Sequence, residues 1–578
     1  MNEQKRFFLF LMVSFLTMFG LQIAMEQAGF FPKPQEKTNQ KAASSETGSD
    51  EKSDSPPSKP ESKKAEQSPE GNTPKPSEPV VKAAEVKPET VNLGSDAPDS
   101  GYLLSLGISN IGSGVVWADS SVFDADHLPG VDTDQKLRLV ETAPASPDSL
   151  TLEIRSVDGE EKLINLAKTG WEFVRESAEA SPVRNLDNGQ SVSLRLSPAE
   201  IPGLTITRTY TLLKNKNQVT SEIQFESSSD QSLVYRLLGP YGLPLEGQWY
   251  SYTYRDLFYA AADPRANLVG RSASEVGKAT DPSSGYTPEI VTIPLRYAGV
   301  ETQYFANFIL IPTESNGTNL IAEATERLLG PLPEDPNRSN IGVVLTSNPV
   351  KLAANQPVTH SFEVFMGPKS RSALEPLGAE ILTSYRRGWA VPGSRALARS
   401  FISPLLDVTY GVTKNLFGLF GASRGSYGLA IILLTVVVRM LIFPFSRKQA
   451  ITSKRMQDLA PRLNEIKEKY KDDRERQGRE TMELYRQAGV NPFSGCLIAM
   501  IQLPVFMGLW QTLNNSVALR HAPFLYIDNL AAPDALFRFP GTIPFLGDYF
   551  NILPLLSVTL MYIQMKLFSP PPANEEAE

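Results

Sequence analysis

The sequence predicts a polytopic α-helical membrane protein that carries a large antiparallel β-sandwich. Long apolar runs stand at the start and in the last third of the 578 residues, whereas the stretch from about 101 to 370 alternates short strand patterns with turn signals. The run GLAIILLTVVVRMLIFPFS at residues 428–446 is about long enough to cross a bilayer, and it contains Arg439. These observations together define the expected fold class.

Composition argues against several classes of function. The net charge is -8 and no region is uniformly basic, which argues against sequence recognition of nucleic acid. The only cysteine, Cys496, stands in an apolar segment, so no intrachain disulfide is expected. His127, His360 and His521 lack the spacing of metal ligands, and we expect no metal and no cofactor.

The first hundred residues divide into an anchor and a linker. Lys5 and Arg6 precede the apolar run 7–25, which predicts an uncleaved signal anchor at residues 1–31 with a cytoplasmic N-terminus. A cleaved signal peptide is the alternative. Residues 32–100 are rich in Pro, Ser, Lys and Glu, and we expect a disordered linker because such a segment buries too little apolar surface to fold.

Residues 101–370 are predicted to form the β-sandwich. Most of the alternate residues of LTITRTYTL are apolar, and the run that includes Val219, Ser221, Ile223 and Phe225 repeats this period of two. The apolar face of the first run carries Leu204, Ile206, Tyr210 and Leu212. Further strands are expected at TLEIRSV, SVSLRLS, SLVYRLL, EIVTIPLRYAGV, QYFANFILIP and HSFEVFMGP. In this stretch no nucleophile elbow, P-loop or paired-carboxylate spacing stands out, so we do not expect an enzyme.

Residues 371–425 are predicted to be connecting and interfacial helices. The stretch SALEPLGAEILTSYRRGW reads as one helix. The next helix has apolar residues at intervals of three and four, opposite charged ones, so it should lie flat on the outer membrane surface. A packed soluble helix is the alternative. The apolar stripe contains Leu397, Phe401, Leu405, Val408, Val412, Leu416 and Leu419.

Residues 426–568 are predicted to form the membrane core. Spans are expected at about 427–446, 492–513 and 550–568. The charged stretch 447–491 predicts a cytoplasmic helical hairpin with KDDRERQG at its tip. Its charges fit either a solvated surface or a contact with a partner such as the ribosome.

Arg439 is the first candidate for a functional residue. A charge inside a span costs roughly 2.5 to 3.5 kcal/mol, so it must face protein, water or a counter-charge. Thr435 and Ser446 share its helical face, and this polar stripe favours a wet cavity. Gln502 and Gln564, in the next two spans, are further candidates for the same cavity. The alternatives are a structural ion pair or partial snorkelling for Arg439, and a bond to a neighbouring helix's carbonyl for Gln502.

The combined pattern closely resembles the YidC membrane protein insertase family of Gram-negative bacteria. The matching stretches are the N-terminal anchor, the large sandwich, LTVVVRMLIFPFSRKQ, LAPRLNEIKEKYKDD and NPFSGCLIAMIQLPVFMGLWQTLNNSVALRHAPF. Within the sandwich, QYFANFILIP and FEVFMGP carry the resemblance.

The resemblance implies a periplasmic β-supersandwich and a five-helix core around a hydrophilic groove in the bacterial inner membrane. The family's groove arginine falls on Arg439. The implied clients are nascent membrane proteins, inserted into the lipid bilayer without nucleotide hydrolysis, and the Sec translocon and, through residues 447–491, the ribosome are implied partners. The family continues with two more membrane helices and a basic tail, so we expect a truncation point within residues 569–578. A naturally short, divergent protein is the alternative.

Two rival hypotheses come from other classes. Sandwiches of this kind resemble sugar-enzyme folds, which suggests a membrane-tethered periplasmic protein that binds or modifies carbohydrate. Such a site would require clustered carboxylates, His and Trp, and the last two are scarce here. A transporter subunit could use Arg439 as an anion site, but internal repeats are not found.

Overall fold

The computed structural model describes residues 86–125, 135–144, 146–177, 179–246, 254–263, 268–279, 288–313, 319–383, 391–419, 425–489, 494–543 and 547–568. Every structural statement below concerns this part of the chain. The predicted signal anchor, most of the predicted linker and the tail 569–578 lie outside it. The described residues all belong to one compact unit, Val80–Glu578.

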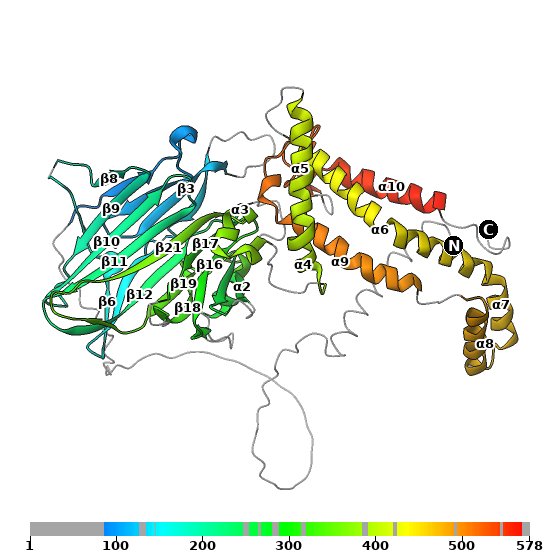
Figure 1. The fold of residues 1–578 in the computed structure, drawn as a ribbon, viewed down its shortest axis with the longest axis horizontal. Coiled ribbons are helices and arrows are strands. Elements are labelled where there is room, and N and C mark those ends of the chain that lie inside the picture. The colour runs from blue at the N-terminus through cyan, green and yellow to red at the C-terminus, as the bar shows by residue number, and fades with distance from the viewer. Residues whose placement is uncertain are drawn as a thin grey trace, which may run out of the picture. The chain divides into compact units, whose positions relative to one another are not determined.

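Two large antiparallel sheets form the predicted sandwich (Figure 1). The first has the order β14-β13-β16-β17-β21-β11-β10-β9-β7, with β8 also paired to β9. Its ten strands are β7 (Glu172–Phe173), β8 (Val183–Leu186), β9 (Gly189–Leu196), β10 (Leu204–Leu213), β11 (Gln218–Ser227), β13 (Asp256–Ala261), β14 (Val269–Ser272), β16 (Leu295–Glu301), β17 (Phe305–Leu310) and β21 (Val358–Pro368). A short helix, α2 (Ala273–Ala279), follows β14.

The second large sheet has the order β15-β18-β19-β12-β5-β6, with β20 paired to β12. Its strands are β5 (Thr151–Val157), β6 (Glu160–Asn165), β12 (Gln231–Tyr241), β15 (Ile290–Val291), β18 (Ile321–Leu329), β19 (Asn340–Ser347) and β20 (Val350–Leu352). A smaller sheet contains β1 (Thr90–Gly94), β2 (Leu104–Ser109), β3 (Val115–Asp124) and β4 (Lys136–Glu141). One apolar cluster joins all three sheets, so the β-sandwich prediction is confirmed.

The alternation along β10 is as regular as its sequence predicts. Leu204, Ile206, Tyr210 and Leu212 are all buried. Arg208 lies on the same face and is also buried, which the apolar pattern alone does not indicate. Its guanidinium donates to the Leu150 carbonyl and, at 3.2 Å, to Ser221 Oγ, and burial lowers its pKa.

The domain begins earlier than the sequence suggested, so the predicted linker 32–100 is too long. Strand β1 pairs with β2 from Thr90 opposite Ser109 to Gly94 opposite Ser105. Leu93 of this strand is fully buried, and Gly94 N donates to Gln190 Oε1 at 2.8 Å. The apolar alternation in TVNLG is too short to be recognised next to the Pro-rich segment, but pairing with β2 stabilises the strand.

The single helix predicted for SALEPLGAEILTSYRRGW is wrong. The structure has a short α3 (Arg371–Leu374) and two 3₁₀ turns, η5 (Glu375–Leu377) and η6 (Glu380–Thr383). Pro376 lies within η5, and Gly378 adopts the left-handed conformation at φ 59°. Both features end an α-helix. The rest of the predicted helix lies outside the described residues.

The helical part follows the predicted order. It contains α4 (Ser394–Leu397), a π-turn η7 (Ala398–Ile402), α5 (Ser403–Gly418), α6 (Tyr427–Asp458), α7 (Ala460–Lys469), α8 (Arg474–Gln487), α9 (Ser494–Asn514) and α10 (Ile552–Phe568). Among the described residues, one helical stretch, Tyr427–Phe445, is long and apolar enough to cross a membrane, and Ile552–Lys566 is a shorter apolar helix. A hairpin of β22 (Phe537–Ile543) and β23 (Gly547–Phe550), which was not predicted, precedes α10.

Helix α5 and the turns before it pack through only part of the predicted stripe, since Leu397 and Leu405 are partly buried against the neighbouring helices. Ile402 of the preceding turn and Leu406 cluster with Ala430 and Leu434 of α6. The stripe members Phe401, Val408, Val412, Leu416 and Leu419 are exposed instead. The helix has two apolar faces, and periodicity alone could not tell which one meets protein.

The charged hairpin is present, with two corrections. The apolar span Tyr427–Phe445 agrees with the predicted 427–446, and helix α6 continues beyond it to Asp458, so the first part of the charged stretch extends α6 instead of forming the hairpin. The turn between α7 and α8 is shorter than KDDRERQG, because Asp473 caps α8 by accepting a hydrogen bond from Arg476 N at 3.0 Å. Figure 1 shows α7 and α8 folded back against each other.

Candidate functional site

A cavity of about 290 Å³ lies between α6 and α9 and contains Arg439. Its lining consists of Thr435, Val438, Arg439, Ile442, Phe443, Gln502, Val505, Phe506 and Leu509. The sequence-predicted residues Thr435, Arg439 and Gln502 therefore meet in one place. The remaining lining is apolar.

Helical periodicity explains this lining. The five α6 residues follow the spacing i, i+3, i+4, i+7 and i+8, counted from Thr435 to Phe443. The four α9 residues follow i, i+3, i+4 and i+7, from Gln502 to Leu509. One face of each helix therefore forms each wall, and Arg439 stands in the middle of its wall.

An apolar cluster holds the two walls together beside the cavity. Leu434 and Val438 of α6 pack in one group with Val505 and Leu509 of α9. Ile402, before α5, belongs to the same group. The polar lining residues thus sit at the edge of a packed helix contact, which limits how far the walls can separate.

The polar groups of the cavity differ in how they are bonded. Thr435 Oγ1 donates to the Ile431 carbonyl at 2.8 Å, so its hydroxyl is left as an acceptor. The side chains of Arg439 and Gln502 are exposed, and within the described part of the chain neither side chain makes a hydrogen bond or an ion pair. A guanidinium with five donors and no internal carboxylate can bind an incoming anion or acceptor.

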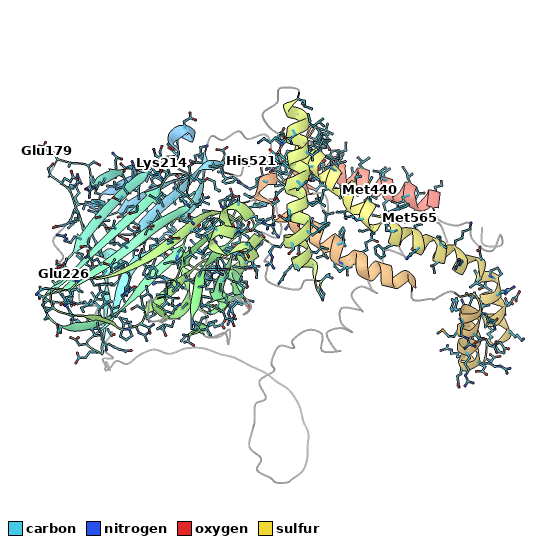
Figure 2. The ribbon with its side chains drawn as sticks, in the orientation of Figure 1. Glu179, Lys214, Glu226, Met440, His521 and Met565 are labelled. Atoms are coloured by element: carbon cyan, nitrogen blue, oxygen red, sulfur yellow. The ribbon has the colours of Figure 1, made fainter. Side chains whose placement is uncertain are left out.

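The other two predicted groove residues are not joined to this cavity. The side chain of Ser446 lies outside the described residues, although its backbone continues α6. Gln564 is exposed on α10, and no described residue of α10 lines the cavity. Figure 2 labels Met440 on α6 and Met565 on α10, both of which are exposed.

Sequence reasoning missed the apolar lining: Val438, Ile442, Phe443, Val505, Phe506 and Leu509. The signal was available, because these residues share helical faces with Arg439 or Gln502. Within the part of the chain that the structure describes, groups of three His, Cys, Asp or Glu that could hold a metal are absent.

A large β-sandwich joined to apolar helices, with one arginine in a cavity between two of them, defines a membrane protein with a substantial extramembrane domain. Two protein-family models match this chain: "YidC periplasmic domain" at residues 125–389 and "60Kd inner membrane protein" at residues 419–578. The chain belongs to the YidC family, which places it in the inner membrane.

Curated relatives carry the name membrane protein insertase YidC. One from Syntrophobacter fumaroxidans is 29% identical over 68% of this chain and 64% of its own. One from Cupriavidus taiwanensis is 28% identical over 68% of this chain and 62% of its own, and one from Pelobacter propionicus is 36% identical over 39% and 38%. The chain thus spans less than two thirds of the length of these relatives.

Solved structures show only a distant likeness. A galactose mutarotase-like protein from Lactobacillus casei is 10% identical, and the match covers 48% of this chain and 100% of that one with a TM-score of 0.29. A score this low supports no inference about function.

Proposed function

We propose that this chain is a membrane protein insertase, which helps to insert and fold newly made inner-membrane proteins through a hydrophilic groove without nucleotide hydrolysis. The observation that carries the proposal is the meeting of Arg439, Thr435 and Gln502 in one cavity between α6 and α9. The names of the curated relatives support it.

Arg439 would receive the hydrophilic or acidic end of a client. A carboxylate in the cavity would gain charge-assisted hydrogen bonds, each worth about 1.5 to 3 kcal/mol when the partner is charged. The rest of the lining is apolar and includes Val438, Val505 and Leu509, and an apolar surrounding strengthens the attraction between charges. Gln502 can donate and accept, so it suits the backbone of a peptide.

The apolar segment of the client would then move along the outer faces of the helices into lipid. Met440, Leu441 and Phe443 of α6 are exposed, as are Leu503 and Phe506 of α9. Transfer of an apolar segment into the bilayer is favourable, and this partition supplies the driving force. A polar cavity next to exposed apolar helix surfaces therefore fits insertion better than conduction through a pore.

The proposed topology places the N-terminus and the α7–α8 hairpin in the cytoplasm and the sandwich in the periplasm. Basic residues of the hairpin fit the positive-inside rule and a contact with the ribosome. They include Arg462, Lys467, Lys469, Arg474, Arg476, Arg479 and Arg486. The Sec translocon is a further proposed partner.

Site-specific crosslinking tests the proposal. A photo-crosslinking amino acid is placed at Thr435, Gln502 or, as a control on the sandwich, exposed Glu226 of the full-length protein, and a short membrane protein is stalled on ribosomes. We expect capture of the nascent chain at Thr435 and Gln502 but not at Glu226. Absence of capture at both groove positions would contradict the groove. Probes at Ser446 and Gln564 then test whether the groove extends to these proposed members.

A further inference from the structure

A tight turn between β16 and β17 is held by a buried lysine. Lys369 Nζ lies 2.7 Å from Glu301 Oε2 and donates to the Thr302 carbonyl at 3.0 Å. Its backbone N also donates to the Tyr304 carbonyl at 2.8 Å. Within the turn, Thr302 N donates to the Phe305 carbonyl at 2.9 Å. The turn is therefore fixed from both sides.

This turn contacts the end of a cavity-forming helix. Gln303 Nε2 donates to the Asn514 carbonyl at 2.7 Å and to Tyr304 Oη at 3.1 Å. Asn514 is the last residue of α9, where backbone carbonyls have no partner within the helix. A side chain of the sandwich thus supplies a hydrogen bond that the helix end lacks.

The segment after α9 contacts the sandwich beside the same β16–β17 turn. Arg520 Nη2 lies 2.7 Å from Glu246 Oε1 and donates to the Asp124 carbonyl at 3.1 Å. The guanidinium carbon stands 5.2 Å from the ring of Phe305, the residue that ends the turn. Val517 joins the apolar core of the sandwich. Figure 2 labels His521, the next residue after Arg520, beside the sandwich.

The two sandwich stretches that carry the family resemblance meet at this contact. QYFANFILIP begins with Gln303 and includes Phe305, and FEVFMGP is followed directly by Lys369. Neither stretch takes part in the cavity, so the proposed groove does not explain them. Gln303 of the first stretch contacts the end of α9, and Lys369, directly after the second stretch, holds the turn that carries Gln303.

A helix transmits this anchoring to the cavity. Gln502 precedes Asn514 by twelve positions, which is about 18 Å along an α-helix. Between them, Val505 and Leu509 line the cavity, while buried Gln511 donates to Ser394 Oγ at 3.4 Å. A shift of the C-terminal end of α9 would therefore be carried to the wall that faces Arg439.

We propose that Gln303 and Arg520 are positioning residues that dock α9 onto the sandwich and thereby set the distance between the two walls of the Arg439 cavity. The sandwich is then a brace for the groove. The inference depends on the proposed function in one respect: it takes the Arg439 cavity to be the groove that receives the client.

Measuring the distance between the two cavity walls tests directly whether the contact of α9 with the sandwich positions them. Spin labels are attached at Thr435→Cys and Gln502→Cys in the full-length protein carrying Cys496→Ser, with and without Gln303→Glu. This substitution keeps the shape of the side chain but turns the donor that faces the Asn514 carbonyl into an acceptor. We expect a shifted and broader distance distribution. An unchanged distribution would overturn the proposal.

Arg520 provides a second, graded test. Arg520→Ala should broaden the same distribution, and Arg520→Lys should restore most of it because the cation beside Glu246 and Phe305 remains. Arg184→Ala is the matched control, since that arginine is exposed and its nearest carboxylate, on Glu176, lies 3.9 Å away. If Arg520→Lys behaves like Arg520→Ala in a protein with unaltered thermal unfolding, positioning by this cation is wrong.

Client crosslinking separates the dock from the proposed function. We expect Gln303→Glu to lower capture at Gln502 several-fold while the protein remains folded. If the unsubstituted protein captures no client, the insertase proposal fails. The spin-label distances still show whether the contact between α9 and the sandwich sets the width of the cavity. If capture occurs and Gln303→Glu leaves both capture and distances unchanged, only the dock is refuted.

Discussion

Lys369 and Glu301 form a fully buried ion pair with 2.7 Å between Nζ and Oε2. Burial raises the pKa of Glu301, and the nearby ammonium of Lys369 only partly opposes this. Burial alone would lower the pKa of Lys369, but the carboxylate of Glu301 raises it overall. Each charge is tolerated in the interior because the other is present.

The first prediction concerns the loss of one member of this pair. Glu301→Gln removes the counter-charge and leaves the Lys369 ammonium buried without compensation, so we expect a loss of about 3 to 5 kcal/mol in the free energy of unfolding. Chemical denaturation of the detergent-solubilised protein measures it. Glu222→Gln, at an exposed position on β11, is the control and should change little. Equal effects of the two substitutions would refute the role given to the pair.

The second prediction concerns pH. Burial raises the pKa of Asp148, although Thr142 Oγ1 donates to its carboxylate at 2.8 Å and lowers it somewhat. The folded-state pKa lies above the unfolded value, so this group's stabilisation is complete below the ordinary value of 3.8 and is lost as pH rises through the folded-state pKa.

Asp148→Asn keeps an acceptor for Thr142 but removes the charge. We therefore expect the variant to unfold at a higher temperature than the original protein at pH 7, with the difference shrinking as pH falls towards 3.8. Thermal unfolding at a series of pH values measures this. A difference that grows on acidification would show that the sign is wrong.

The third prediction tests the packing of α9 near the cavity. A Cβ on Gly508 would lie 2.9 Å from Ile402 Cδ1 and 3.2 Å from the Ser394 carbonyl oxygen. Gly508→Leu should therefore force α9 away from α4 and η7, at a loss of roughly 1 to 3 kcal/mol as found for overpacked sites. Gly418→Leu is the matched control, because a Cβ there would meet nothing within 4 Å. Similar thermal unfolding of both variants would mean that the helices adjust freely.

The periodicity of apolar residues predicted individual strands and helices well, because this pattern depends only on residues that are close in sequence. A period of two located β10 and β11 at their observed positions, and the helical spacing from Arg439 led to Thr435. The same reasoning overlooked Arg208, since a buried guanidinium breaks the apolar pattern while occupying the inward face. It donates to the Leu150 carbonyl, just before β5, and to Ser221 of β11, both of which lie outside its own strand.

Long-range choices could not be predicted from the sequence. Gln303 and Asn514 are 211 positions apart, and no local pattern indicates that one meets the other. Helix α5 offered two apolar faces, and only its packing against α6 selects the one with Leu406. Likewise Gln502 and Gln564 are both glutamines within apolar runs, but among the described residues only Gln502 lines the cavity with Arg439, and the sequence alone does not distinguish the two.

The fourth prediction concerns the charge of Arg439. Arg439→Ala removes hydrogen bonds to a charged client group worth about 1.5 to 3 kcal/mol. Crosslinking at Gln502 to a client with an acidic end should then fall roughly 10- to 100-fold at limiting client concentration. Arg439→Lys should lie between, because the charge remains while the planar fork of donors is lost.

A matched client isolates this electrostatic contribution from general damage to the cavity. When the acidic residues of the client are replaced by their amides, the difference between the Arg439 protein and Arg439→Ala should shrink strongly, since a neutral acceptor gains less from a guanidinium. The apolar lining formed by Val438, Ile442 and Phe506 is unchanged in both proteins, so it cannot produce this dependence on the client's charge. An equal loss for acidic and amide clients would show that Arg439 supports the shape of the cavity and does not attract the client.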